Sequence, residues 1–238
     1  MFFKKTELPG VMPKHISFII DGNGRWAKKR GMPRSYGHKI GLETVKKTVD
    51  MVEEFKIPYV SFYCFSTENW SRDKEEIDGI FKLVREYLLT DFVDVYAKRN
   101  MRLVIYGDPS RFPQDMPDAL NDAIGKTKGN TGTTIILCIN YGGRDEILYA
   151  VNKLLKSGKK QVTMEDIQNN LYSAGIPDPD FIVRTSGEQR ISNYMLFQSA
   201  YSEYSFPKTL WPDFNRKLFV EALWEFSKRN RRFGGIKK

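Results

Sequence analysis

The residues best suited to bind an anion lie in one short stretch near the carboxyl end of the chain. Arg184 and Arg190 stand on either side of a Thr-Ser-Gly turn, and Ser192 follows two residues after the second arginine. A guanidinium can donate two parallel hydrogen bonds to phosphate oxygens, and hydroxyl groups can complete the set of donors. The stretch therefore predicts a phosphate site. The alternative is a solvated loop in which Glu188 pairs with the arginines.

A second group of candidates follows the first apolar run, in the sequence Asp-Gly-Asn-Gly-Arg-Trp. Gly22 and Gly24 would let the backbone approach a ligand closely, and amides at a helix start favour anions. Arg25 adds a positive charge, and Asp21 could hold a metal ion or orient a water. The alternative is a tight strand-to-helix turn, because Asp-Gly and Asn-Gly are common turn dipeptides.

Two further connections carry polar side chains after apolar runs. In the first, Trp70 and Arg72 suit a ligand with an apolar part and an anionic part. The alternative there is a helix cap with its partners, formed by Ser66, Thr67, Glu68 and Asn69. In the second, Gly142 and Gly143 predict a structural turn, after which Arg144 begins a helix.

These segments must be positioned by alternating strands and helices. The predicted strands are 15–21, 59–65, 101–106, 133–141 and 180–185. The predicted helices are 38–55, 74–97, 116–128, 144–155 and 215–229, with Arg34 and His38 in the turn before the first. Strands that are apolar throughout favour a mostly parallel sheet flanked by helices, in which ligands bind at the carboxyl ends of the strands.

The chain reads as a single α/β domain over residues 15–238, preceded by an N-terminal extension at 1–14. Its 238 residues, 41% hydrophobic and 28% charged, are typical of one globular domain. Cys64 and Cys138 lie in apolar runs, which predicts buried thiols and a reducing cytoplasm. No run approaches the ~18 apolar residues of a membrane span, and the first ten residues do not resemble a signal peptide.

The net charge of +9 indicates an anionic partner. Several catalytic and binding patterns are absent, among them the P-loop, the dinucleotide-binding glycine pattern, zinc spacings, G-x-S-x-G and D-D-x-x-D. A nucleic-acid-binding protein is an alternative suggested by the charge and the basic end, but no helix-turn-helix, RNA-binding or zinc signature supports it.

Taken together, six segments resemble the cis-prenyltransferases, and bacterial isoprenyl transferases of the undecaprenyl diphosphate synthase type in particular. The segments are HISFIIDGNGRWAKKRG, GH at 37–38, FSTENWSR at 65–72, NYGGRDEI at 140–147, RTSGEQRISN at 184–193 and LWPDF at 210–214. The resemblance extends from about His15 to Gly235. Departures are small: Ile20 stands where Met is usual, and Gln189 occupies a variable position.

The resemblance implies a parallel sheet flanked by helices, a homodimer and a Mg²⁺-dependent enzyme. Such enzymes condense an allylic diphosphate with successive isopentenyl diphosphates, with each new double bond cis. The product expected here is undecaprenyl diphosphate from farnesyl diphosphate, a lipid carrier precursor for cell-wall synthesis; a shorter product is the alternative. A non-catalytic subunit of a two-component enzyme is disfavoured, because Asp21, Arg184 and Arg190 are all present.

The resemblance also assigns roles to residues. It implies that Asp21 and Glu203 bind Mg²⁺ and that Asn69 accepts a proton, although a neutral amide is a poor base. The allylic diphosphate is expected at Gly22, Asn23, Gly24, Arg25, Arg34 and His38. The isopentenyl diphosphate is expected at Arg184, Arg190 and Ser192. The predicted substrate-binding residues further include Trp26, Ser66, Thr67, Glu68, Trp70, Arg72 and Ile191.

The product would need an apolar tunnel and access to a membrane. An amphipathic stripe on 74–97 could line the tunnel or simply fill the core. It comprises Ile77, Ile80, Phe81, Val84, Tyr87, Leu88, Phe92 and Val95. Peripheral contact of this cytoplasmic protein with the inner face of the membrane is a further expectation, through Lys4, Lys5, Lys237 and Lys238.

Overall fold

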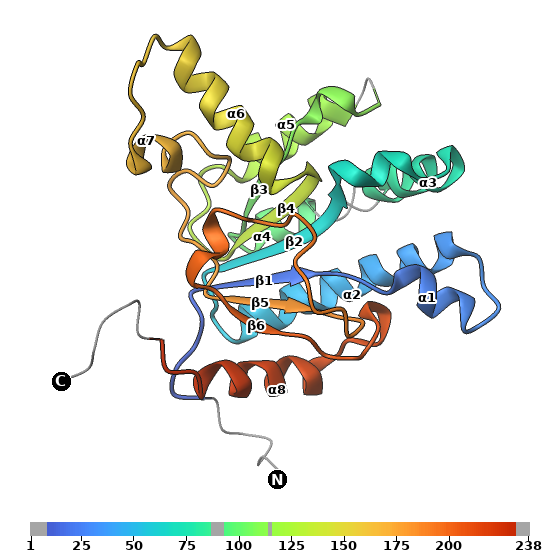
Figure 1. The fold of residues 1–238 in the computed structure, drawn as a ribbon. Coiled ribbons are helices and arrows are strands. Elements are labelled where there is room, and N and C mark those ends of the chain that lie inside the picture. The colour runs from blue at the N-terminus through green and yellow to red at the C-terminus, as the bar shows by residue number, and fades with distance from the viewer. Residues whose placement is uncertain (1–8, 87–92, 114–115, 232–238) are drawn as a thin grey trace.

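Parallel strands form the centre of the molecule in the computed structural model, which describes residues 9–86, 93–113 and 116–231. The six-stranded sheet has the order β3-β4-β2-β1-β5-β6, and every neighbouring pair is parallel (Figure 1). The strands are β1 (His15–Ile19), β2 (Tyr59–Ser66), β3 (Arg102–Tyr106), β4 (Thr134–Tyr141), β5 (Phe181–Arg184) and β6 (Glu203–Ser205). The five strands and the parallel α/β class predicted from the sequence are confirmed.

Helices and short 3₁₀ turns connect the strands. The α-helices of the described part are α1 (Asn23–Lys28), α2 (Arg34–Glu54), α3 (Lys74–Val84), α4 (Val93–Lys98), α5 (Met116–Thr127), α6 (Gly143–Lys156), α7 (Met164–Gln168) and α8 (Arg216–Ser227). The 3₁₀ helices described are η1 (Thr67–Ser71), η3 (Pro109–Arg111), η4 (Gln198–Tyr201) and η5 (Trp211–Asp213). Because the sheet lies between α8 and α6, both of its faces are covered (Figure 1).

The first face of the sheet is covered by a mainly apolar core. Side chains of α2, α3, α5 and α8 pack there against alternate strand residues. Phe18 of β1 stacks on Phe62 of β2 with ring centroids 5.5 Å apart, and Trp211 and Phe219 pack beside Phe18. Burial of these large rings, together with the aliphatic side chains around them, stabilises this layer through the hydrophobic effect.

The second face carries tyrosines and a closed set of buried hydrogen bonds. Ser17 Oγ donates to Tyr194 Oη at 2.8 Å, and Ser61 Oγ donates to Ser17 Oγ at 2.8 Å. The Nε2 atom of His15 lies 2.9 Å from Ser61 Oγ. Burial lowers the pKa of His15 to about 4, so its ring is neutral at physiological pH. The two faces therefore differ in polarity although both are buried.

The predicted start of α2, at residue 38, is four residues later than the start in the structure. Arg34 and His38 were expected in a turn, but the helix begins at Arg34, so both residues lie on it. Pro33, with φ −65° and ψ 152°, occupies the N-cap position, where its missing N–H costs nothing. Gly37 lies within α2, where it allows α1 to pack closely against this helix.

The helix predicted over 74–97 is described as two pieces, α3 and α4. Ile77, Phe81 and Val84 are buried as predicted, whereas Val95 is 50% exposed and its neighbour Tyr96 is buried. The predicted stripe is therefore wrong at Val95. Three of its residues lie outside the described residues, namely Tyr87, Leu88 and Phe92.

The sixth strand, β6, was not predicted. It pairs with β5 at the sheet edge through Phe181↔Glu203 and Val183↔Ser205. Three residues are too short to show the alternation by which a strand is recognised.

Glycine residues allow α1 and α2 to come into direct contact. A Cβ on Gly37 would lie 2.1 Å from the backbone oxygen of Asn23, and a Cβ on Gly41 would lie 2.2 Å from its Oδ1. Since no side chain fits at these distances, the two glycines fix how α1 lies against α2. The position of the Asp21–Arg25 turn follows from this contact.

We predict that Gly37→Ala lowers the free energy of unfolding by about 1–3 kcal/mol, because the added methyl group must displace the Asn23 backbone. Urea unfolding followed by circular dichroism measures the change. Gly125→Ala in α5 is the matched control: no atom lies within 4 Å of its Cβ, so it should stabilise the helix by about 0.5–1 kcal/mol. Equal unfolding midpoints for the two variants would contradict the packing argument.

Candidate functional site

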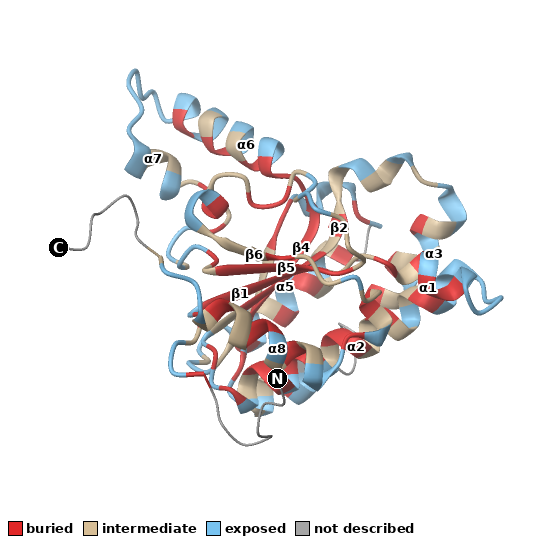
Figure 2. Ribbon diagram, turned by 60° about the horizontal axis from the view of Figure 1, so that its bottom comes forward, coloured by how far each residue is buried: buried red, intermediate tan, exposed pale blue. Residues whose placement is uncertain are grey.

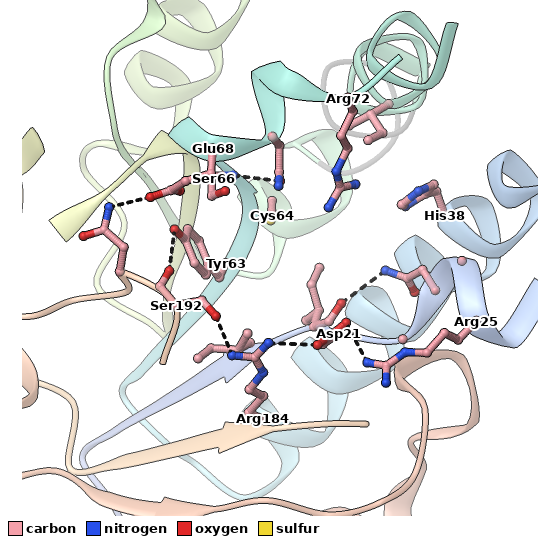
Figure 3. Close-up of a pocket in the computed structure, with 18 of the residues that line it drawn as sticks. Asp21, Arg25, His38, Tyr63, Cys64, Ser66, Glu68, Arg72, Arg184 and Ser192 are labelled. Carbon is pink, nitrogen blue, oxygen red and sulfur yellow. Dashed lines mark hydrogen bonds and ion pairs between the residues drawn. The ribbon is translucent and has the colours of Figure 1, made fainter. Parts of the chain in front are cut away.

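The carboxyl ends of β1, β2 and β5 open onto a cavity of about 660 Å³. Ile19, the last residue of β1, is in register with Tyr63 of β2 and Arg184 of β5, so the connections that follow these strands meet at one edge. The cavity is lined by Ile19, Ile20, Asp21, Gly22, Asn23, Gly24, Arg25, Arg34, His38, Tyr63, Cys64, Ser66, Glu68, Asn69, Arg72, Ile80, Arg144, Arg184, Ser192 and Asn193. The two candidate anion sites therefore share one cavity (Figure 3).

Two glycines shape the turn from β1 into α1. Gly22 has φ 110°, and a Cβ there would lie 2.9 Å from Leu210 Cδ2. A Cβ on Gly24 would lie 2.8 Å from both Cζ and Nη1 of Arg34. Glycine at position 24 thus lets the Arg34 guanidinium rest against the first turn of α1, beside the cavity.

Asp21 lies between two arginines. Arg184 Nη2 is 2.9 Å from Asp21 Oδ2, and Arg25 Nη2 is 3.2 Å from Oδ1 (Figure 3). The other nitrogen of Arg184, Nη1, donates to Ser192 Oγ at 2.7 Å and to the backbone oxygen of Arg190 at 2.6 Å. Arg25 also donates to Ser186 Oγ at 2.6 Å. One carboxylate therefore ties the β1–α1 turn to the loop after β5.

The Asp21 carboxylate is held in its charged form. Burial raises the pKa of this group, but the hydrogen bond and charge of Arg184 outweigh that effect, with help from Ser186 and Arg25. The resulting pKa lies below the ordinary value. Asp21 is therefore ionised at neutral pH and carries a full negative charge at the cavity wall.

A second carboxylate, Glu76 of α3, collects three cavity-lining side chains that can carry positive charge. Glu76 Oε1 lies 3.0 Å from Arg34 Nη2, 2.9 Å from Arg72 Nη1 and 3.2 Å from His38 Nε2. Burial lowers the pKa of His38, as do both nearby arginines, while Glu76 opposes the change, so the ring is mostly neutral at pH 7. Glu76 positions these side chains, and sequence reasoning missed it because it looks like any helix-surface acid.

The connection after β2 serves as a cap and as cavity wall at once. The Oδ1 atom of Asn69 accepts a hydrogen bond from the Ser66 amide at 3.0 Å, in a capping box. The predicted cap is therefore present, and Ser66, Glu68 and Asn69 also face the cavity. Burial raises the pKa of Glu68, but hydrogen bonds from Asn193, its own backbone N–H, Ser66 and Thr67 together outweigh burial, so the pKa is lowered.

Both predicted tryptophans are structural. Trp70 Nε1 donates to Asn140 Oδ1 at 2.7 Å, and the ring packs against Phe65 and Phe81. Trp26 Nε1 donates to Asp213 Oδ1 at 2.7 Å. Their rings anchor the β2–η1 connection and α1, and neither ring belongs to the lining of the cavity.

Three other predicted substrate-binding residues lie beside the cavity rather than in its lining. Arg190 is exposed and pairs with Glu188 at 2.6 Å, although its backbone oxygen binds Arg184. Ile191 packs against the tyrosine-rich core, and Thr67 Oγ1 donates to Asp145 at 3.0 Å. The alternative interpretation, in which Glu188 pairs with the arginines, therefore describes the Arg190 side chain in this structure.

The two carboxylates predicted to bind magnesium are not brought together within one chain. Glu203 is in register with Phe181, at the amino end of β5, whereas Asp21 meets Arg184 at the carboxyl end. Its Oε2 atom lies 3.9 Å from Arg229 Nε. A site shared by Asp21 and Glu203 would therefore need a second copy of the chain.

Asp21 alone provides one of the carboxylate ligands expected at a magnesium site. Mg²⁺ is usually held by one or two carboxylates together with phosphate oxygens and water, and Asp21 offers an ionised carboxylate at the wall of an anion pocket. Across the described ranges there is no group of three or more His, Cys, Asp or Glu side chains arranged to hold a metal. The residues thus fit a metal that is held jointly with a phosphate ligand.

Some cavity residues were not predicted as ligands. Arg144 is the second residue of α6, which begins at Gly143 rather than after the Gly142-Gly143 pair, and its backbone N–H donates to Asn193 Oδ1 at 2.9 Å. Both residues line the cavity. Both residues lie within the motifs at 140–147 and 184–193, so these motifs were the feature of the sequence that could have identified them as cavity residues. Ile80 belongs to the predicted stripe on α3 and lines the cavity as well.

Comparison with known proteins gives the family. A family model described as "Putative undecaprenyl diphosphate synthase" matches residues 19–234, so the chain belongs to this family of prenyltransferases. Proteins called isoprenyl transferase are similar over almost the whole chain. That of Clostridium perfringens is 44% identical, covering 95% of this chain and 91% of the relative, and that of Bacillus subtilis is 42% identical, covering 99% and 92%.

Solved structures of related enzymes share the fold. Lavandulyl diphosphate synthase from Lavandula x intermedia, in complex with dimethylallyl diphosphate, is 30% identical with a TM-score of 0.89, over 94% of this chain and 98% of that one. A "probable undecaprenyl diphosphate synthase" from Campylobacter jejuni is 31% identical with a TM-score of 0.80, over 94% and 99%. The chain is thus an enzyme of the isoprenyl transferase class, and the resemblance seen in the sequence is confirmed.

We predict that Asp21→Asn destabilises the protein by about 2 kcal/mol at neutral pH, because the buried Arg184 loses a charged hydrogen-bond partner. The pKa of Asp21 is lowered on folding, so its stabilising effect is complete above the unfolded pKa of about 3.9 and is lost as pH falls through the folded pKa. The difference between wild type and variant should therefore shrink in acid, as measured by urea unfolding at several pH values.

Asp78→Asn provides the control, since Asp78 is an exposed carboxylate paired with Lys74 on α3. It should change stability by less than about 0.5 kcal/mol at every pH. A penalty for Asp21→Asn that stays constant into acid would show that the charge of Asp21 is not what stabilises the site.

Proposed function

We propose that this isoprenyl transferase condenses an allylic diphosphate with successive molecules of isopentenyl diphosphate and makes each new double bond cis. The supporting observation is the composition of the cavity. Its wall includes the arginines Arg25, Arg34, Arg72, Arg144 and Arg184. Two carboxylates, Asp21 and Glu68, and apolar side chains such as Ile20 and Ile80 complete it. A substrate that joins a diphosphate to a hydrocarbon requires both positive side chains for its anionic part and apolar side chains for its hydrocarbon part.

The positive side chains fall into two groups, as two diphosphates require. Arg34 and Arg72, oriented by Glu76, lie on the α2–α3 side, together with His38. Arg184, with Ser192 at 2.7 Å, lies on the side of β5. We assign the allylic diphosphate to the first group and isopentenyl diphosphate to the second. Arg25 adds to the first group, and Asp21 stands between Arg25 and Arg184 (Figure 3).

The first group would carry out the electrostatic part of the reaction. When the allylic C–O bond breaks, negative charge grows on the departing diphosphate, and preorganised guanidinium donors stabilise that charge. Arg25 and Arg34 are already held in place by Glu188 and Glu76. A magnesium ion bound at Asp21, with Glu203 of a second copy as the other predicted carboxylate, would supply further charge neutralisation on phosphate oxygens.

The new carbon–carbon bond leaves a tertiary carbocation, from which a proton must depart. Asn69 is a weak candidate for the base, because a neutral amide has almost no basicity and its Oδ1 already accepts the Ser66 N–H at 3.0 Å. The amide nitrogen of Asn69 remains for orienting a substrate oxygen or a water. We assign the proton to an oxygen of diphosphate.

Farnesyl diphosphate is the proposed starter and undecaprenyl diphosphate, a lipid carrier precursor for cell-wall synthesis, the proposed product. A shorter cis-prenyl chain is the alternative, since tunnel depth sets the length. We further propose that residues 15–238 act as one catalytic domain after an extension at 1–14, and that the enzyme works in the cytoplasm as a homodimer. None of the helices within the described ranges has the length and apolar character to cross a membrane.

We predict that the purified protein alone converts farnesyl diphosphate and isopentenyl diphosphate to longer products when Mg²⁺ is present, and that EDTA stops the reaction. Asp21→Ala should reduce turnover at least about a hundredfold, because charge balance between the two anion groups is lost. Incorporation of labelled isopentenyl diphosphate measures turnover, and mass spectrometry gives the chain length. Near-wild-type turnover by a folded Asp21→Ala protein would refute the role of Asp21.

A second prediction separates orientation from base catalysis at Asn69. Asn69→Ala and Asn69→Asp should both lower kcat, and Asn69→Asp should not be the faster, because a carboxylate repels the neighbouring diphosphates. Single-turnover kinetics with saturating substrates would report the effect on chemistry. If Asn69→Asp exceeded Asn69→Ala, a proton-accepting role would be supported instead.

A further inference from the structure

The end of α1, the connection that follows it and the first residues of α2, together residues 28–36, project from the body of the protein (Figures 1 and 2). We call it the α1–α2 hairpin. All nine of its residues are exposed, including Met32 at 40% and Tyr36 at 37%. The hairpin therefore places two large side chains with apolar surface in contact with solvent.

The hairpin is strongly basic. From Gly22 to Leu42 the sequence contains no Asp or Glu but includes Arg25, Lys28, Lys29, Arg30, Arg34 and Lys39. Arg30 pairs with Asp213 at 3.3 Å. For Lys28 and Lys29, by contrast, no carboxylate of the described residues lies within ion-pair distance. The tip therefore presents uncompensated positive charge around an exposed methionine.

The hairpin has a fixed shape. Trp26 is covered by Arg30, whose Cζ lies 4.0 Å from the ring centroid, and by the Tyr36 ring at 6.1 Å. Met32 N–H donates to the Ala27 carbonyl at 3.0 Å, and Gly31 takes a φ of 66° to close the turn. These contacts hold the turn in one conformation. Met32 is therefore already exposed, and a surface that binds it loses little conformational entropy in the hairpin.

A groove of about 510 Å³ joins the hairpin to the cavity. It is lined by Gly24, Arg25, Lys28, Gly31, Met32, Pro33 and Arg34. Gly24, Arg25 and Arg34 also line the main cavity. A surface that contacts Lys28 and Met32 would thus lie next to the arginines that hold a diphosphate.

From this arrangement we propose that the α1–α2 hairpin docks the enzyme on an anionic lipid bilayer. Lys28 and Lys29 face the phosphate headgroups, and Met32 enters the interface between headgroups and acyl chains. The inference rests on the proposed function, because a long prenyl diphosphate is insoluble in water and must pass into a membrane. Its diphosphate could move from Arg25 and Arg34 to the headgroup layer without crossing an apolar region.

The test is co-flotation of the full chain with vesicles of phosphatidylcholine, with and without phosphatidylglycerol. We expect wild type to bind the phosphatidylglycerol vesicles. Lys28→Glu/Lys29→Glu should weaken binding at least about tenfold, and Met32→Ser should weaken it by a smaller factor. High salt should abolish the charge-dependent part.

The matched control is Lys153→Glu/Lys156→Glu on α6, which reverses two exposed charges at the far side of the sheet and should leave vesicle binding unchanged. Far-ultraviolet circular dichroism checks that each variant is folded. Wild-type vesicle binding by the hairpin variants, an equal loss in the α6 control, or no binding by wild type would each overturn the proposal. So would retention on duplex DNA that depends on the hairpin while vesicle binding does not.

An assay of prenyl transfer with soluble substrates in detergent, without vesicles, distinguishes the test of membrane docking from the test of the proposed function. The hairpin variants should transfer prenyl groups at the wild-type rate in detergent and lose rate only when product must enter vesicles. Loss of transfer in detergent would place Lys28 and Lys29 in the substrate site and contradict a docking role. Vesicle binding by a protein without prenyl transfer would refute the proposed function and leave the docking surface standing.

Discussion

A buried guanidinium is the constraint on which the site depends. Arg184 is 5% exposed, and a cation withdrawn from water to this degree must be paired and hydrogen-bonded. Its partners are Asp21, Ser192 and the backbone of Arg190, which belong to two separate connections. The need to satisfy one side chain therefore fixes the β1–α1 turn relative to the loop after β5, and the cavity is the space that this arrangement encloses.

The same principle operates on the other wall of the cavity through Glu76. Like charges repel, so Arg34 and Arg72 would separate without a counter-ion between them. Glu76 holds both, at 3.0 and 2.9 Å, and joins α2 to α3. Positive side chains gathered in advance need little rearrangement when an anion arrives, which is the condition under which electrostatic stabilisation is most effective.

The sequence predicted what depends on local pattern. The apolar runs predicted five of the strands and the parallel class, and the rule that ligands bind at strand ends placed Asp21, Arg25 and Arg184 in one cavity. The contacts of the tryptophans were not predicted, because a hydrogen bond such as Trp70 to Asn140 joins residues seventy positions apart, which no local pattern reveals.

Long-range pairing also explains the other differences. Glu76 resembles its exposed neighbour Glu75 in sequence, and its position facing Arg34 and His38 depends on how α3 packs on α2. Glu203 lies at the amino end of the sheet because β6 pairs with β5 in a particular register, and a strand of three residues gives no signal of that register.

The unequal polarity of the two sheet faces has a consequence for the direction in which a hydrocarbon can grow. On the Phe18 side, an elongating isoprenoid would exchange one set of apolar contacts for another. On the Ser17 side it would have to part Ser17, Ser61 and Tyr194, and each polar group left without a partner would cost about 1–3 kcal/mol. Under the proposed function, the sheet would thus act as a one-sided barrier that directs the hydrocarbon chain beneath α2 and α3.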